Sequence, residues 1–409
     1  MGLDRCGLSP IVLRKVVYAG ANGVSFAHAS SDLMNLSDIH IDPKQVERHT
    51  ERIGRERVEQ RDAAVASFRT RPLMEKDVAA DSSRPCPPVA AVAVDGGRIQ
   101  IRREPNATAE TESHWRESKA ATLMTYSSAI SAVDPDPDVP RCFLDLHGTL
   151  KLVRGMGHAA VGVDVAAEVA AESAEAPGAD RPSRPGRPVP LVRSVSASRA
   201  TADRFGPMVE QAAWERNFMG SKRQVFLGDG QACNWTIQRE HFPTFTPVLD
   251  FVHALSYVFE AAFAGHPAEA GAAAYRRWIA AVWSGNVTTI LPELSQRIAD
   301  LGGPAKDLAT SDPRHAVMDA LRYLENNAQR MRYDEYRRQG LPIMTSSIES
   351  AIKQINRRVK GSEKFWTEAG AEAVLQLRAD YLSETDPMEK FWTDRDTRMD
   401  GRRPYRKAG

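Results

Sequence analysis

The sequence is poor in the features that mark disulfide-rich, zinc-binding and membrane proteins. Its 409 residues include only 4 cysteines, and no two of them form a Cys-x-x-Cys pair. This excludes a disulfide framework and a zinc finger, and it indicates a reducing compartment. No apolar run approaches the roughly 18 residues that span a bilayer. The apolar stretch near the N-terminus is interrupted by Gly20, Asn22 and Gly23, so it does not resemble a signal peptide. We therefore expect a cytoplasmic protein without a membrane partner.

The chain also has little net charge. Its 54 basic and 53 acidic side chains leave a formal charge of +1, so no global basic field points to nucleic acid. Basic residues that contact a polyanion would have to be clustered locally. The length is enough for a large core and about two or three domains.

Residues 1–75 have a helical pattern. Asp42 followed by Pro43 is typical of a helix start, and the helix should continue to about residue 68. With a short helix at 29–36 before it, this segment resembles a helix-turn-helix. Four cations share one face of the longer helix, namely Lys44, Arg48, Arg52 and Arg55. Contact with DNA is one interpretation of this stripe. An ordinary solvated face is the other, because glutamates are interleaved with the cations.

The middle of the chain predicts strands that end in carboxylates. Residues 92–102 predict a hairpin, with Asp95 ending its first strand and Gly96-Gly97 forming the turn. Residues 119–128 and 224–227 predict further strands, and the second of these runs into Gly228-Asp229-Gly230. Residues 247–251 predict another strand, followed by helices from 252 onward. Residues 134–198 predict an irregular insertion.

Three carboxylates stand out as candidate metal ligands. Asp95 needs a partner, because an unpaired buried charge is costly, and backbone amides are the alternative to a metal. Asp229 lies between glycines, and Glu349 opens a helix predicted over 347–360. That helix carries an apolar stripe of Ile348, Ile352, Ile355 and Val359 and an adjacent stripe of Lys353, Arg357 and Lys360. Carboxylates that bind two divalent ions, next to basic side chains that bind phosphate, are suited to cleavage of a phosphodiester bond. Magnesium fits this donor set. The alternative for Glu349 is a surface ion pair with Lys353.

Longer strings of sequence resemble the DDE transposases of bacterial insertion sequences, with the ISKra type, related to the Mutator superfamily, as the nearest group. The strings are FLGDGQACNW at 226–235, PVLDFVHA at 247–254, NAQRMRYDEYRRQGLPI at 327–343, IESAIKQ at 348–354 and VKGSEKFWTEAGAEAV at 359–374. The resemblance covers about 90–132 and 200–393. In this group Gly-Ser-Gly usually precedes the catalytic glutamate, whereas this chain has Thr345-Ser346-Ser347 there, and Ser347 can still cap the helix.

The resemblance implies a mixed α/β fold with an RNase H-like catalytic core, an all-helical insertion and a helix-turn-helix-like N-terminal region. It implies that Asp95, Asp229 and Glu349 bind two Mg²⁺ or Mn²⁺ ions, with Asp250 and His253 as accessory residues. The alternative for Asp250 is a helix cap. Trp283 could stack on a distorted base, although its helical spacing favours core packing. The expected divisions are an N-terminal DNA-binding region at 1–75, a linker at 76–90, the first part of the core at 91–253, a helical insertion at 254–340, the last core helices at 341–383 and a tail at 384–409.

The expected function is therefore that of a nucleoid-associated transposase that cleaves and joins DNA, acting on double-stranded DNA as a homodimer or higher oligomer. One alternative is an inactive or domesticated transposase that binds DNA without cutting it. Another is an RNase H-like metal nuclease without strand transfer. All three carboxylates are needed only if the protein is an enzyme.

Overall fold

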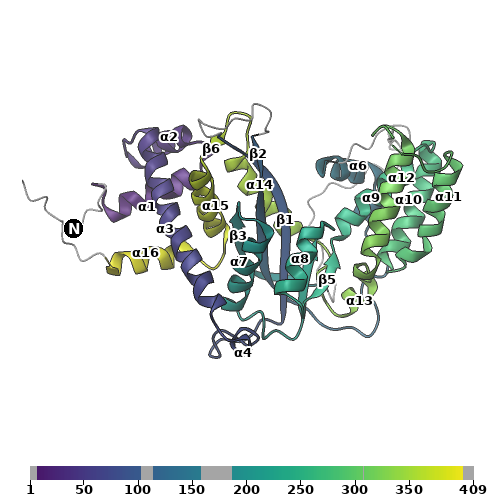
Figure 1. Cartoon of the computed structure of the whole chain (residues 1–409), viewed down its shortest axis with the longest axis horizontal. Coiled ribbons are helices and arrows are strands. Elements are labelled where there is room, and N and C mark those ends of the chain that lie inside the picture. Colours follow the sequence, from purple (N-terminus) through teal and green to yellow (C-terminus); the bar gives the residue numbers. More distant parts are fainter. Residues whose placement is uncertain (1–6, 103–113, 158–186, 307, 399–409) are drawn as a thin grey trace, which may run out of the picture.

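A computed structural model describes residues 7–102, 114–157, 187–306 and 308–398 of the chain. Within them, one six-stranded mixed sheet lies at the centre, with helices gathered at both ends (Figure 1). The strand order is β3-β2-β1-β4-β5, and β6 extends the far end of β1. β1 and β2 are antiparallel, β2 and β3 are antiparallel, and β4, β5 and β6 continue the sheet with parallel pairings. The mixed α/β class expected from the sequence is confirmed.

The central strand corrects the predicted hairpin. β1 runs unbroken from Val89 to Ile101 and pairs along its length with β2 (Trp115–Ser127). Gly96 and Gly97 do not turn, because they pair with Lys119 and Ser118 in the ladder. A Cβ at Gly97 would lie 3.3 Å from Ser118 Oγ and 3.5 Å from Asn356 Oδ1. The glycine therefore accommodates a close helix, a contact that local sequence cannot reveal.

The predicted irregular insertion at 134–198 is also wrong in part. Helices α5 (Arg141–Leu144) and α6 (Leu146–Gly155) lie within it. Its last residues form edge strand β3 (Val189–Ser198), which pairs with β2. Proline at 190 and the exposure of residues 189–192 are typical of an edge strand, and this disguised the strand in the sequence. Residues 158–186 of the predicted insertion lie outside the described part.

Two short parallel strands complete the sheet, as predicted. β4 (Gln224–Gly228) lies between β1 and β5 (Thr246–Leu249). Helix α7 (Ala202–Glu215) precedes β4, and α8 (Ala232–His241), which the sequence analysis missed, connects β4 to β5. β1 and β4 are apolar runs because side chains on both faces of each strand are buried.

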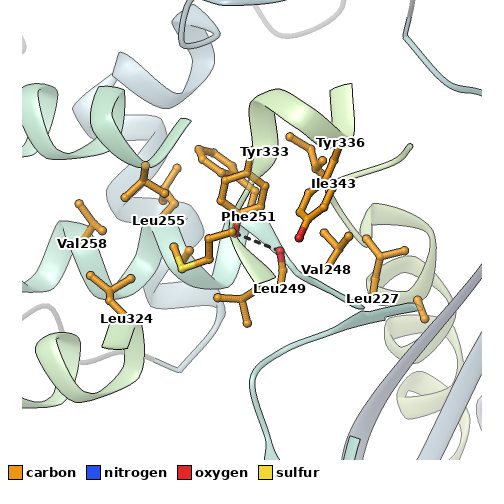
Figure 2. Close-up of a cluster of buried hydrophobic side chains, with 14 of the residues drawn as sticks. Leu227, Val248, Leu249, Phe251, Leu255, Val258, Leu324, Tyr333, Tyr336 and Ile343 are labelled. Atoms are coloured by element: carbon orange, nitrogen blue, oxygen red, sulfur yellow. Dashed lines mark hydrogen bonds between the residues drawn. The ribbon is translucent and has the colours of Figure 1, made fainter. Parts of the chain in front are cut away.

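A helical body follows β5 and forms the end of the molecule at the right of Figure 1. It comprises α9 (Phe251–Phe263), α10 (Ala268–Trp283), η2 (Val287–Thr289), α11 (Leu291–Asp300), α12 (Pro313–Asn327), η3 (Ala328–Arg330) and α13 (Tyr333–Arg338). The chain breaks at η3, which separates α12 from α13. Figure 2 shows the junction with the sheet, where Tyr333 donates to the carbonyl of Leu249 at 3.0 Å.

The N-terminal helices are docked on the C-terminal ones. α1 (Pro10–Asn22), α2 (Phe26–Ser37) and α3 (Pro43–Arg69) form one group, and α3 packs along α15 (Glu368–Leu382). A Cβ at Gly54 would come within 2.6 Å of Ala373, so glycine permits this crossing. Asp42 caps α3 with Pro43 next to it, as predicted. The short α4 (Leu73–Lys76) begins the connection to β1.

The predicted tail at 384–409 contains a docked helix. α16 (Pro387–Arg398) buries Met388, Phe391 and Trp392 against Leu13 and Val17 of α1. Residues 399–409 lie outside the described part. The first and last helices of the described chain therefore pack together, because apolar side chains of α16 cover the apolar side of α1.

Helix α14 (Ser346–Val359) covers one face of the sheet and leads to β6 (Phe365–Trp366). Its apolar stripe packs as predicted, with Ile348, Ile355 and Val359 buried. Ile355 shares a core cluster with Ile99 and Ile101 of β1. Since alternate residues of a strand share a face, this is also the face of Asp95. Ser347 lies inside α14 rather than capping it.

Candidate functional site

Asp95 and Asp229 come from neighbouring parallel strands. The β1–β4 ladder ends with Val94 opposite Gly228, and each aspartate is the next residue of its strand or loop. Asp95 lies in the middle of β1 rather than at its end, because β1 continues along β2. Burial and the charge of Asp229 raise the pKa of Asp95 to about 6. Only the Gly96 amide, 2.6 Å from Asp95 Oδ1, and the nearby His253 oppose this rise.

Asp229 is held firmly by the turn that follows β4. Its carboxylate accepts from the Gln231 amide at 3.0 Å, from Gln231 Nε2 at 2.7 Å and from Asn234 Nδ2 at 2.8 Å. Asn234 also donates to the Val94 carbonyl at 3.4 Å. One amide side chain therefore links Asp229 to the strand that carries Asp95. Asn234 was not among the residues predicted from the sequence, although it lies within the 226–235 string.

The helical body reaches the same turn. Tyr323 of α12 donates its hydroxyl to the Asp229 carbonyl at 2.7 Å. Its ring stacks on Tyr257 of α9 with centroids 3.8 Å apart. Gly230 has φ +96°, and a Cβ there would lie 2.6 Å from Tyr323. Glycine is therefore required at this position for both its backbone conformation and this contact.

Asp250 is fully buried and acts as a structural anchor. One oxygen caps α9 by accepting from the amides of Val252 at 2.6 Å and His253 at 3.3 Å. The other accepts from the Thr345 amide at 2.6 Å and from the Thr345 hydroxyl. The helix-cap interpretation of Asp250 is confirmed. Thr345 therefore links the start of α14 to the start of α9.

The helix that carries Glu349 begins near Asp95 and Asp229. The Glu349 carboxylate itself does not join the two aspartates. Its amide bonds to the Thr345 carbonyl at 3.1 Å, and Thr345 contacts Asp250, whose own amide bonds to the Gly228 carbonyl at 2.9 Å. This sequence of contacts brings the first turn of α14 to the edge where β4 ends. The Glu349 carboxylate, however, lies 3.5 Å from Lys353 Nζ. In the described residues, no three acidic, histidine or cysteine side chains are grouped as a metal site.

The donor set of the aspartate pair suits a divalent cation. Asp95 Oδ2 and the Asp229 oxygens are hard ligands, and a cation between them would relieve the repulsion that raises the pKa of Asp95. The pair alone supplies two ligands. Glu349 would have to leave Lys353 to become a third.

The predicted basic stripes differ in their surroundings. Lys353 and Arg357 of α14 and Lys360, the residue after its end, are exposed, and Lys360 Nζ lies 5.8 Å from the centroid of the Trp115 ring. On α3 the cations are interleaved with acids. Lys44 pairs with Glu47 at 2.7 Å, Arg52 with Glu56 at 3.6 Å and Arg55 with Glu51 at 3.5 Å, while Arg48 is exposed. The α3 stripe therefore has less free positive charge than the sequence pattern suggests.

Trp283 belongs to the core, as its spacing favoured. It is 1% exposed, and its indole donates to the Asp136 carbonyl at 2.9 Å. The Arg337 guanidinium lies 4.2 Å from its ring and pairs with Asp134. Base stacking by this side chain would require the helical body to open.

No helix in the described residues combines the length and the apolar character needed to cross a membrane. A scan of protein-family models found none that matches this chain, and a search of curated proteins found no significant match.

Proposed function

We propose that this chain is a DDE-type transposase that cleaves and joins DNA with divalent metal ions. The observation that carries the proposal is the placement of Asp95 and Asp229 one residue beyond the end of the same parallel ladder. Two carboxylates on neighbouring strands, one of which raises the pKa of the other, are an arrangement that a divalent cation would stabilise.

The architecture supports the same proposal. Three antiparallel strands followed by two strands parallel to the first, in the order 3-2-1-4-5, are the arrangement that an RNase H-like core would have. The helices of 251–338 then correspond to the helical insertion that the sequence resemblance implies. α14 returns over the face of Asp95 with Glu349 in its first turn.

In this proposal each side chain has a distinct task. Asp95 and Asp229 hold the metal, Asn234 keeps them in register, and Asp250 with Thr345 fixes where α14 begins. Glu349 is the third ligand once it leaves Lys353. Bound magnesium would activate the attacking oxygen and stabilise the leaving one.

The decisive assay uses supercoiled plasmid that carries the inverted repeats flanking the gene. Purified protein is incubated with Mg²⁺ or Mn²⁺, and nicked, linear and joined products are separated on gels. We expect wild-type protein to cleave and join, and Asp95→Asn and Asp229→Asn to bind DNA without cutting it. Cleavage that survives Asp95→Asn would refute the assignment of the pair. Cleavage without joined product would instead indicate a nuclease.

One observation favours a second candidate, a DNA-binding protein that has lost cleavage. Glu349 pairs with Lys353 rather than joining the aspartates. Lys353→Met tests this directly, because it removes the competing cation. Cleavage that appears or rises in this variant supports the enzyme. Retention of DNA by the wild-type protein, with no cleavage by either protein under either metal, supports the second candidate.

A further inference from the structure

A large groove lies away from the aspartate pair, between the N-terminal and C-terminal helices. It has a volume of about 980 Å³ and is walled by α1, α2, α14, α15 and the start of α16. Two buried arginines form part of its wall, Arg358 from α14 and Arg378 from α15, which are 3% and 6% exposed. A buried guanidinium group is normally paired with a carboxylate. A buried arginine without such a partner is therefore a candidate binding site for an anionic ligand.

Neither arginine has a full set of partners. Arg358 Nε donates to the Gly20 carbonyl at 3.0 Å, and its guanidinium lies over the Phe26 ring at 4.4 Å. Its Nη2 has no hydrogen-bond partner. Arg378 donates to the Asn22 side chain and to the Gln354 carbonyl at 3.3 Å, but its Nε has none.

The two positive charges also lack a counter-ion. In the described part of the chain, neither guanidinium forms an ion pair with a carboxylate. Burial and the neighbouring charge of Arg378 lower the pKa of Arg358 to about 10, and the charge of Glu47, which pairs with Lys44 at 2.7 Å, opposes this shift. Burial also lowers the pKa of Arg378. Arg358 and Arg378 are two buried, mutually repelling positive charges in the groove wall. Their positions indicate that an anion balances this charge.

The acids of the groove do not supply that compensation. Asp380 pairs with Arg57 at 2.9 Å, Glu389 lies 3.7 Å from Arg14, and Asp32 pairs with His28 at 3.0 Å. Asp386 lies at the turn into α16. Exposed cations, Lys15 and Arg357, also line the groove, and Arg357 continues the basic stripe of α14.

We propose that this groove is a phosphate-binding site in which Arg358 and Arg378 hold a phosphate group, assisted by Lys15 and Arg357. Guanidinium groups match phosphate oxygens in geometry, and a phosphate in the groove would supply the negative charge that the two arginines lack. The phosphate comes from a DNA backbone or from a free phosphate compound. The DNA source rests on the proposed function, whereas binding of free phosphate does not.

The test measures binding by the full-length chain in EDTA, so that its outcome is independent of metal-dependent cleavage. In one arm, unfolding temperature is followed with inorganic phosphate and pyrophosphate against sodium chloride of equal ionic strength. In the other, affinity for a duplex of random sequence is measured by fluorescence anisotropy at several salt concentrations. The variant is Arg358→Gln/Arg378→Gln. The matched control is Arg216→Gln, because Arg216 is half-buried, lies outside the groove and bonds to Leu123, Val192 and Ser194.

We expect the double variant to lose a stabilisation by pyrophosphate that wild type and the control retain. If DNA is the source, the variant binds duplex at least tenfold more weakly. Its log–log salt slope would fall by about 1.8 for two lost contacts. If the double variant does not fold, Lys15→Gln/Arg357→Gln replaces it, since both side chains are exposed. Equal responses of variant and wild type in both arms, or no response of wild type in either, would overturn the proposal. Failure here with intact plasmid cleavage leaves the proposed function standing.

Discussion

Replacing Asp95 by asparagine should make the protein more stable in the absence of metal. Burial and the charge of Asp229 raise the pKa of Asp95 from 3.8 to about 6. Each tenfold change in proton affinity corresponds to about 1.4 kcal/mol, so the ionised carboxylate destabilises the native state by up to about 3 kcal/mol. Asparagine has nearly the same shape, has no charge, and its oxygen can still accept from the Gly96 amide.

The pH dependence gives the sign of this effect. Below about pH 3 the carboxyl group is protonated in both native and unfolded protein, and the variant should show no advantage. As pH rises through about 6, the native protein must give up a proton that it holds more tightly than the unfolded chain does, so wild type loses stability relative to the variant. The advantage of Asp95→Asn should be complete above about pH 7.

Urea titrations of wild type and Asp95→Asn in EDTA, at several pH values between 4 and 8, measure this difference. Mg²⁺ should then stabilise wild type and not the variant, because a ligand that binds only the native state raises its stability. A variant that is less stable than wild type at pH 8 would refute the electrostatic reasoning. An advantage that is the same at pH 4 and pH 8 would do so as well.

Four further variants test the surroundings of the pair, three at its anchors and one on the basic stripe of α14. Asp250→Ala should destabilise the protein by more than about 3 kcal/mol in urea titrations, since the buried carboxylate accepts from Val252, His253 and Thr345. Thr345→Val should cost about 1–2 kcal/mol, because it removes the hydroxyl donor to Asp250 and leaves the Thr345 backbone donor in place. A cost equal to that of Asp250→Ala would show that the backbone donor contributes nothing. Tyr323→Phe should cost about 1 kcal/mol, because it loses the bond to the Asp229 carbonyl but keeps the stack on Tyr257; an unchanged stability would show that this bond contributes nothing. Lys353→Ala/Arg357→Ala should weaken binding to duplexes of every sequence and flatten its salt dependence in anisotropy titrations, whereas an unchanged salt slope would show that this stripe does not face DNA.

Much of the local structure was predictable because it depends on near neighbours in the chain. The cap at Asp42 with Pro43, the apolar stripe of α14 and the core position of Trp283 all follow from spacings of a few residues. The strand before Asp229 was predicted for the same reason. These features need only the helix and strand periods and the chemistry of caps.

The errors share another cause. Gly96-Gly97 was interpreted as a turn because glycine is common in turns, but here it makes room beneath Asn356. The edge strand β3 and the helix α16 were missed because each is stabilised by partners far away in the sequence, β2 and α1. Local composition says nothing about such partners.

For the candidate site, the sequence alone determined which residues are candidates for metal binding: two aspartates beside glycines and a glutamate in the first turn of a basic helix. Tertiary structure decided how they meet. Parallel pairing of β1 with β4 brings Asp95 to Asp229, and the contact of Asp250 with Thr345 brings α14 to the same edge, while Glu349 remains paired with Lys353. The physical reason is that strand register and helix docking are set by contacts between distant segments, whereas the residue types that can hold a metal are written locally.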